Sequence, residues 1–209
     1  MNSDIRALFP GADERVYLDT SARSLVPDPV REAVEAHLRV RQFEGGDKDT
    51  LWAMLNRTRE AFAKLINADA DEVAITKNVS EGLNLFGASL PWQAGDNVVL
   101  CPDLEHPNNI YLWYNLKELH GIEVRSVAAE SGHLSVAGMA AAMDDRTRLV
   151  TLPTISFAPG FVSDVRGVVQ AAKRVGALTM VDAAQSIGAI QTDVRQLGLD
   201  ALTVATQKC

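Results

Sequence analysis

The chain has 209 residues, of which 47% are hydrophobic and 22% charged, and its formal net charge is −7. This length predicts one large domain or a domain with an appendage, and the acidic balance argues against a nucleic-acid-binding protein. The apolar runs are only strand-sized, so we expect no membrane-spanning helix. The first residues do not resemble a signal peptide, and the two cysteines are not spaced for metal binding, which favours a cytoplasmic location.

Residues 1–65 are predicted to form an N-terminal arm of helices. The prolines at positions 27 and 29 begin a helical apolar pattern that includes Val30, Val34 and Leu38, and a pair of glycines at positions 45 and 46 ends it. A second helical pattern then runs to Ile66. These residues lack the strand–helix alternation of the remaining chain.

Residues 66–209 are predicted to form an α/β domain. Strand-like apolar runs alternate with amphipathic helical patterns along this part of the chain. Such alternation predicts a mostly parallel sheet flanked by helices on both faces. The expected strands are residues 72–76, 97–101, 122–127, 148–155, 178–181 and 201–205, and the expected helices are residues 80–90, 108–120, 136–143 and 164–175.

Two of the expected strands each deliver a charged residue at the carboxyl end. Asp182 follows residues 178–181, and Lys208 lies just beyond residues 201–205. Open α/β sheets present reactive groups at this edge. Pyridoxal phosphate chemistry needs such a pair, because the lysine forms a Schiff base and the acid keeps the pyridine nitrogen protonated. The ordinary alternatives are a solvated lysine and an aspartate that caps a turn.

The segment at residues 76–82 joins an expected strand to a helix and suits a phosphate group. Backbone N–H groups at a helix start are unpaired and carry the positive end of the helix dipole, and Ser80 adds a hydroxyl. The alternative is a simple capping box formed by Asn78 and Glu81, which would still leave N–H groups free. The glycine-rich fingerprints of NTPases and dinucleotide-binding reductases are absent, although the α/β pattern would permit a reductase.

His106 is the histidine that the sequence places at the same edge of the sheet. Pro107 biases His106 to an extended backbone, so the residue is expected in a loop. A loop imidazole there can stack on a planar cofactor and move protons near neutral pH.

Five segments in order resemble the class V aminotransferase family, the fold-type I pyridoxal phosphate enzymes that include cysteine desulfurases. They are VYLDTSA at residues 16–22, TKNVSEGLNL at 76–85, EHPNNI at 105–110, VDAAQSIG at 181–188, and the stretch from DV at 193–194 through LGLD at 197–200 to Lys208. The resemblance covers nearly the whole chain and indicates the large domain of this fold.

The resemblance also implies a role for each matching residue. Lys208 is the Schiff-base lysine and His106 the stacking histidine, and both are the expected catalytic residues. Asp182 binds the pyridine nitrogen and Gln185 the ring oxygen. The residues expected to bind the phosphate are Val79, Ser80 and Gln207.

Three positions depart from the family pattern. Phe157 stands where desulfurases usually carry an asparagine, so one polar contact is missing. Gln207 precedes the lysine where the family often has histidine, and it is a replacement phosphate donor. Val79 replaces a hydroxyl residue, and only its backbone N–H would serve.

The expected function is therefore that of a pyridoxal phosphate-dependent enzyme that acts on an amino acid by desulfuration, C–S elimination or transamination. The resemblance implies a homodimer, and also a C-terminal small domain that this sequence lacks. The alternative is a truncated, non-catalytic α/β module for cofactor binding or protein interaction.

Overall fold

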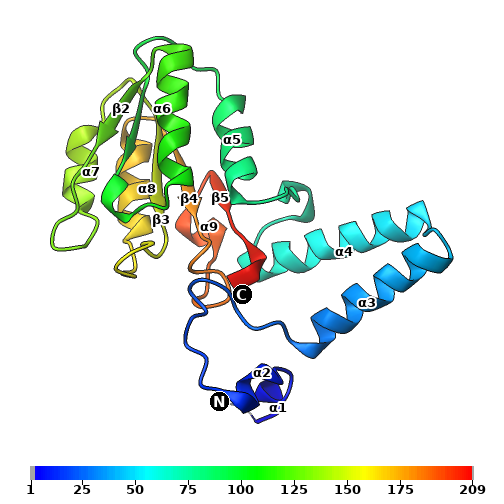
Figure 1. Ribbon diagram of the computed structural model, residues 1–209. Helices are drawn as coiled ribbons and strands as arrows, with labels where there is room; N and C mark the ends of the chain where they lie inside the picture. Colours follow the sequence, from blue (N-terminus) through cyan, green and yellow to red (C-terminus); the bar gives the residue numbers. More distant parts are fainter. Residues whose placement is uncertain (1–2, 209) are drawn as a thin grey trace.

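The computed structural model describes residues 3–208, which form one parallel sheet with helices around it (Figure 1). The strands are β1 (Asn97–Leu100), β2 (Glu123–Ser126), β3 (Thr147–Pro153), β4 (Leu178–Asp182) and β5 (Ala201–Thr203). The α-helices are α1 (Ser3–Arg6), α2 (Gly11–Glu14), α3 (Asp28–Phe43), α4 (Lys48–Ile66), α5 (Val79–Ser89), α6 (Asn108–His120), α7 (Val136–Ala142), α8 (Val165–Arg174) and α9 (Val194–Leu197). Three 3₁₀ turns complete the list: η1 (Ala70–Glu72), η2 (Pro102–Leu104) and η3 (Thr206–Lys208).

The sheet has the strand order β2-β1-β3-β4-β5, and all its strand pairs are parallel. Parallel neighbours need a crossover between them, and helices supply the crossovers here. The predicted α/β class and the mostly parallel sheet are confirmed. The bounds of these five strands and of α5 to α8 agree with the sequence-based bounds to within about two residues.

Alternate residues of the central strands point into two separate cores, one on each face of the sheet. On one face Val98, Leu149 and Met180 pack with α5 and α6 around the fully buried Trp113. On the other face Val99, Val150 and Val181 pack with α7 and α8. This alternation follows from the two-residue period of a strand, and it explains why the central strands β1, β3 and β4 carry apolar residues on both faces.

Helix α5 approaches the end of the sheet closely because residue 82 is glycine. A Cβ atom at Gly82 would lie 3.1 Å from Cγ2 of Thr203 on β5, which is tighter than an ordinary contact. The missing side chain therefore brings the start of α5 next to the carboxyl end of β5.

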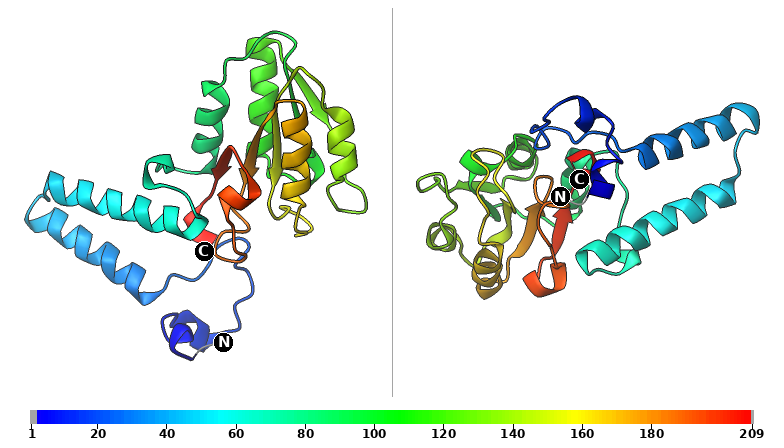
Figure 2. Two further views of the ribbon diagram at one scale, coloured as in Figure 1. Left: turned by 180° about the vertical axis from the view of Figure 1, so that it is seen from behind. Right: turned by 90° about the horizontal axis from the view of Figure 1, so that it is seen from below.

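Helices α3 and α4 form a hairpin that extends away from the sheet (Figures 1 and 2). Gly45 and Gly46 adopt positive φ angles between the helices, and the Asp47 side chain caps α4 by accepting from the Thr50 N–H at 2.8 Å. The expected apolar residues of α3 are exposed in this chain: Val30, Val34 and Leu38. The division into residues 1–65 and 66–209 stays a prediction.

The strand expected at residues 72–76 is wrong. Residues 70–72 form the turn η1, and residues 73–76 are extended but unpaired. A groove of about 430 Å³ is lined by this segment and by β5, and the ladder of β5 is formed with β4 instead. The Arg59 guanidinium instead donates to the Val73 carbonyl oxygen at 2.8 Å.

None of the helices in the described part of the chain combines the length and the apolar character that crossing a bilayer requires.

Substitution of Leu83 tests the core between α5, α6 and the sheet. Leu83 is fully buried, so Leu83→Ala is expected to lower the free energy of unfolding by about 2–5 kcal/mol through lost burial and a residual cavity. Leu85→Ala on the same helix is the control, because Leu85 is 59% exposed. Urea unfolding measures both, and an equal loss in the two variants would contradict this packing.

Candidate active site

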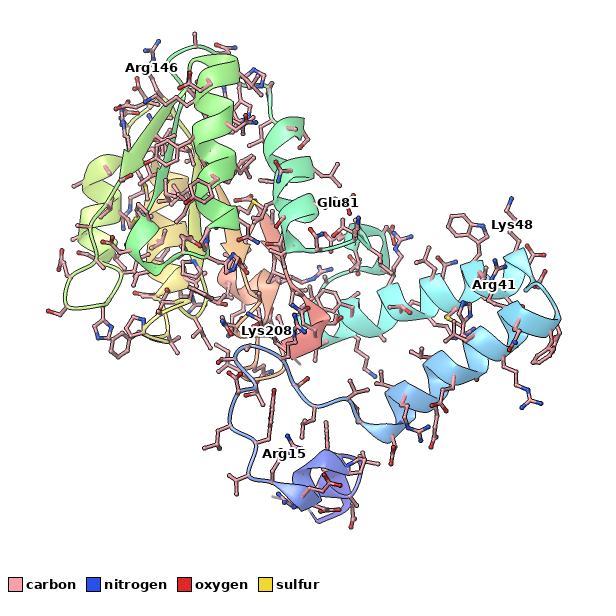
Figure 3. All side chains as sticks on the ribbon, in the orientation of Figure 1. Arg15, Arg41, Lys48, Glu81, Arg146 and Lys208 are labelled. Atoms are coloured by element: carbon pink, nitrogen blue, oxygen red, sulfur yellow. The ribbon has the colours of Figure 1, made fainter. Side chains whose placement is uncertain are left out.

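A cavity of about 490 Å³ opens at the carboxyl ends of β3, β4 and β5, beside the starts of α5 and α6. Figure 3 shows Lys208 where the end of the chain meets the base of α4. The structure brings together at this one cavity all seven residues that the sequence singled out. They are Val79, Ser80, His106, Asp182, Gln185, Gln207 and Lys208.

Asp182 is the last residue of β4 and is only 6% exposed. The strand period places it on the same face as Met180, towards α5 and α6. Its carboxylate accepts from the Ala184 N–H at 2.9 Å. Burial raises the pKa of Asp182 above the ordinary value, while the Ala184 N–H, His106 and Lys208 act in the opposite direction. Among the described residues that line the cavity, Asp182 is the only acidic one.

Lys208 is half-buried in the turn η3, just beyond β5. With the Gln185 amide oriented so that both of its groups are paired, the Gln185 oxygen accepts from Nζ of Lys208 at 3.2 Å. The Gln185 nitrogen then donates to the Ser21 carbonyl oxygen, also at 3.2 Å. The amide thus links the lysine to the N-terminal segment.

The N-terminal segment also holds the residue before the lysine. The Ser24 N–H donates to the Gln207 carbonyl oxygen at 2.9 Å. The Tyr17 hydroxyl fixes the loop of this segment by donating to the Arg23 carbonyl oxygen at 2.7 Å. Residues 17–24 therefore brace the turn that presents Lys208.

His106 lies in the loop between η2 and α6, as expected from Pro107. Its Nδ1 lies 2.9 Å from Oδ1 of Asn108, and this contact fixes the ring orientation. The Phe157 ring meets the imidazole edge to face, with 4.8 Å between centroids. Both residues line the cavity.

The start of α5 forms one corner of the cavity. Asn78 caps the helix by accepting from the Glu81 N–H at 2.9 Å, and the Glu81 carboxylate accepts from the Lys77 N–H. This is the predicted cap, except that Glu81 bonds one residue earlier than in a capping box. Within the described residues, the N–H groups of Val79 and Ser80 find no acceptor, so they suit a phosphate.

Sequence reasoning missed two residues at this site. Asn108 bridges its two halves, because its Nδ2 donates to Oγ of Ser80 at 3.3 Å while its Oδ1 meets His106. Glu105 is only 4% exposed behind His106, although glutamates are rarely buried. In the sequence, the only indication of a role for Asn108 or Glu105 is that both belong to the motif around His106.

The arrangement places a primary amine and a buried carboxylate in a cavity that also carries an imidazole and a helix start. A flat, ring-shaped ligand with an anionic substituent would match these groups, since the anion has the helix N–H groups and a cationic ring atom has Asp182. Carbonyl compounds can react with a lysine amine in such a setting.

Comparison with known proteins gives related sequences and structures. A probable cysteine desulfurase of Methanothermobacter thermautotrophicus is 39% identical over 203 residues, which are 94% of this chain and 50% of that protein. The apo structure of the cysteine desulfurase from Thermococcus onnurineus has a TM-score of 0.88 at 27% identity and covers 99% of this chain and 53% of its own. A C-DES mutant with glycine covalently linked to its PLP cofactor has a TM-score of 0.90 at 24% identity. The match covers 97% of this chain and 55% of the C-DES chain, and it shows the shared fold.

The chain spans about half the length of the curated relatives that it matches. The model of the aminotransferase class-V family matches residues 16–209, which is nearly the whole chain. The resemblance inferred from the five motifs is therefore confirmed, and the chain belongs to the aminotransferase class-V family.

Proposed function

We propose that this chain binds pyridoxal phosphate through Lys208 and acts on an amino acid, as a cysteine desulfurase-like enzyme, a C–S lyase or an aminotransferase. The observation that carries the proposal is the convergence of Lys208, Asp182, His106 and the start of α5 on one cavity. These residues come from separate parts of the sequence, and their common position provides each group that the cofactor needs.

The residues present fit the cofactor. The cavity volume of about 490 Å³ falls within the roughly 300–1,000 Å³ of small-molecule sites. The amine, the buried acid and the helix start match the aldehyde, the ring nitrogen and the phosphate of pyridoxal phosphate, respectively. When bound, pyridoxal phosphate supplies an electron sink for negative charge at the α-carbon of an amino acid.

The side chains on the ring side of the site would hold and orient the cofactor. Asp182 accepts a hydrogen bond from the protonated ring nitrogen and thereby keeps that proton in place. Gln185 donates its amide to the ring oxygen after giving up its bond to the Ser21 carbonyl. His106, fixed by Asn108, offers its face to the ring.

The phosphate would lie at the start of α5. The N–H groups of Val79 and Ser80 donate to its oxygens, the Ser80 hydroxyl adds a third donor, and the side chain of Gln207 reaches the same cavity. Lys208 would hold the cofactor through Nζ, and its free amine could move a proton at the substrate α-carbon.

The proposed substrate is an amino acid, and cysteine is the first to test. The support is that the relative from Methanothermobacter and the aligned protein from Thermococcus are named as cysteine desulfurases. Phe157 lines the cavity and is half exposed, so it gives the substrate side an apolar wall. Elimination and transamination remain within the proposal because they share the opening chemistry.

Replacement of Lys208 tests the covalent attachment. The wild-type chain, incubated with pyridoxal phosphate and reduced with borohydride, is expected to carry the cofactor mass on the peptide that contains Lys208. Lys208→Ala removes the only amine assigned to this step, so the label should be lost. Lys117→Ala, an exposed lysine on α6, is the matched control and should keep it. Equal labelling of the Lys208→Ala chain at other lysines would refute the assignment.

Replacement of Asp182 tests the ring contact. Asp182→Asn removes the charge but not the volume, and a charge-assisted hydrogen bond is worth about 1.5–3 kcal/mol. We expect cofactor affinity to fall roughly 10- to 100-fold. Fluorescence titration with pyridoxal phosphate measures the affinity. Asp145→Asn, at an exposed position, is the control, and an unchanged affinity in Asp182→Asn would contradict the proposed contact.

A homodimer forms part of the proposal. The support is the exposed apolar surface of the α3–α4 hairpin, which includes Val34, Leu38, Leu51 and Trp52. Sedimentation equilibrium is expected to show a dimer, and Leu38→Glu is expected to weaken it because a charge would enter the buried interface. Arg39→Glu on the same helix is the control, since Arg39 is already charged and exposed. A monomer at all concentrations would contradict this proposal.

The same exposed apolar surface also favours a second candidate function, a module that binds cofactor or a protein partner without turnover. Release of sulfide, ammonia or a keto acid from cysteine by the purified chain would exclude this alternative. Cofactor binding without any product would support it.

A cytoplasmic location also remains a proposal, supported by the free thiol of the buried Cys101.

A further inference from the structure

Glu105 is a buried acid that the proposed chemistry leaves without a role. It follows η2 and directly precedes His106, and its side chain is almost fully enclosed. Both of its carboxyl oxygens are buried without a hydrogen-bond partner among the described residues. A carboxylate in this position would carry an unpaired charge, which is costly in a protein interior.

Three polar groups on neighbouring elements interact with Glu105. The charge of Asp182, at the end of β4, raises the pKa of Glu105. Cys101 follows β1, and burial together with the charges of Asp103 and Glu105 raises the pKa of its thiol to about 11, so the thiol is neutral at pH 7. The Asn109 amide on α6 is the third neighbour. Asn109 has other partners, because its Nδ2 donates one hydrogen to the Thr151 hydroxyl at 2.8 Å and its Oδ1 accepts from Trp113 at 3.2 Å. The second Nδ2 hydrogen acts on Glu105 from outside hydrogen-bond geometry.

Two neighbouring carboxyl groups in a low-dielectric region cannot both ionise cheaply, so their surroundings decide which one holds the proton. Asp182 has the Ala184 N–H, His106 and Lys208 to stabilise its charge, and it faces the cavity. Glu105 has only Asn109 to stabilise a negative charge. Burial together with the charge of Asp182 raises the pKa of Glu105 well above the ordinary value. These surroundings favour the proton on Glu105 over Asp182.

We propose that Glu105 is a positioning residue: it stays neutral behind His106 and leaves Asp182 as the charged member of the carboxyl pair. The neutral acid stays enclosed in the loop that carries His106 and adds no second negative charge that would act on Asp182. The value of this arrangement for the cofactor ring rests on the proposed function, because it is Asp182 that would face the ring nitrogen. The protonation pattern of the two carboxyl groups does not depend on a bound cofactor.

The test is a pH titration of the chain labelled with ¹³C at its glutamate carboxyl groups, carried out without cofactor. One glutamate resonance is expected to titrate at distinctly higher pH than the others. Asp182→Asn removes the neighbouring charge and should move that titration to lower pH. Glu105→Gln should delete the resonance, and Glu118→Gln, an exposed site on α6, should leave it in place. Uniform titration of all glutamates, or no response to Asp182→Asn, overturns the proposal.

A second measurement follows from linkage. Because the pKa of Glu105 is raised on folding, the stability that its neutral form supports is complete below about pH 4.5, the ordinary value. It is lost as the pH rises towards the pKa in the folded chain. The folding constant of the wild type should therefore fall relative to Glu105→Gln, by at most about tenfold per pH unit. Glu118→Gln should follow the wild type, and parallel profiles for all three chains refute the inference.

These measurements need no cofactor, so their outcome is independent of the proposed function. If Glu105→Gln does not fold, the wild-type and Asp182→Asn titrations still decide the matter. If the chain fails to bind pyridoxal phosphate but the abnormal glutamate is present, the proposed function fails while the carboxyl pair stands.

Discussion

The parallel pairing of β3, β4 and β5 is the constraint on which the site depends. The register aligns Pro153, Asp182 and Thr203 across the three strands, so the strands end together at one edge of the sheet. Asp182 is thus buried between neighbours on both sides, and the chain that follows β5 turns at once into η3 with Lys208. A shift of β4 by one residue would turn Asp182 to the α7–α8 face and remove the acid from the cavity.

The same edge collects the starts of two helices, and this sets its electrostatic character. Helices α5 and α6 both begin beside the cavity, and Asn108 ties them together by contacting Ser80 and His106. The lining side chains include Lys77, Lys208 and His106 but, within the described residues, a single acid. The helix dipoles and the basic side chains favour an anionic ligand, while Asp182 provides one local site for a cation.

Most of the fold and the principal groups of the site were predictable because they follow from short-range patterns. Strand period and flanking polar residues located Asp182 and Lys208, and the polar residues before α5 located its capped start. The predicted strand at residues 72–76 failed because pairing depends on a neighbour, and the ladder of β5 is formed with β4 instead. Asn108 and Glu105 could not be predicted, since a contact 28 residues away and complete burial in a loop are properties of the tertiary structure.

The departure from the family pattern at Phe157 is compatible with an intact site. An asparagine at this position would offer a polar partner, but the His106 ring already has one in Asn108 at 2.9 Å. The edge-to-face contact with Phe157 therefore leaves no buried polar group of His106 unpaired, and aromatic pairs in this geometry are favourable by about 0.5–1.5 kcal/mol. What changes is the wall of the cavity, which becomes apolar beside His106 and Ile155. The residue at position 157 thus affects the shape and polarity of the cavity more than the orientation of His106.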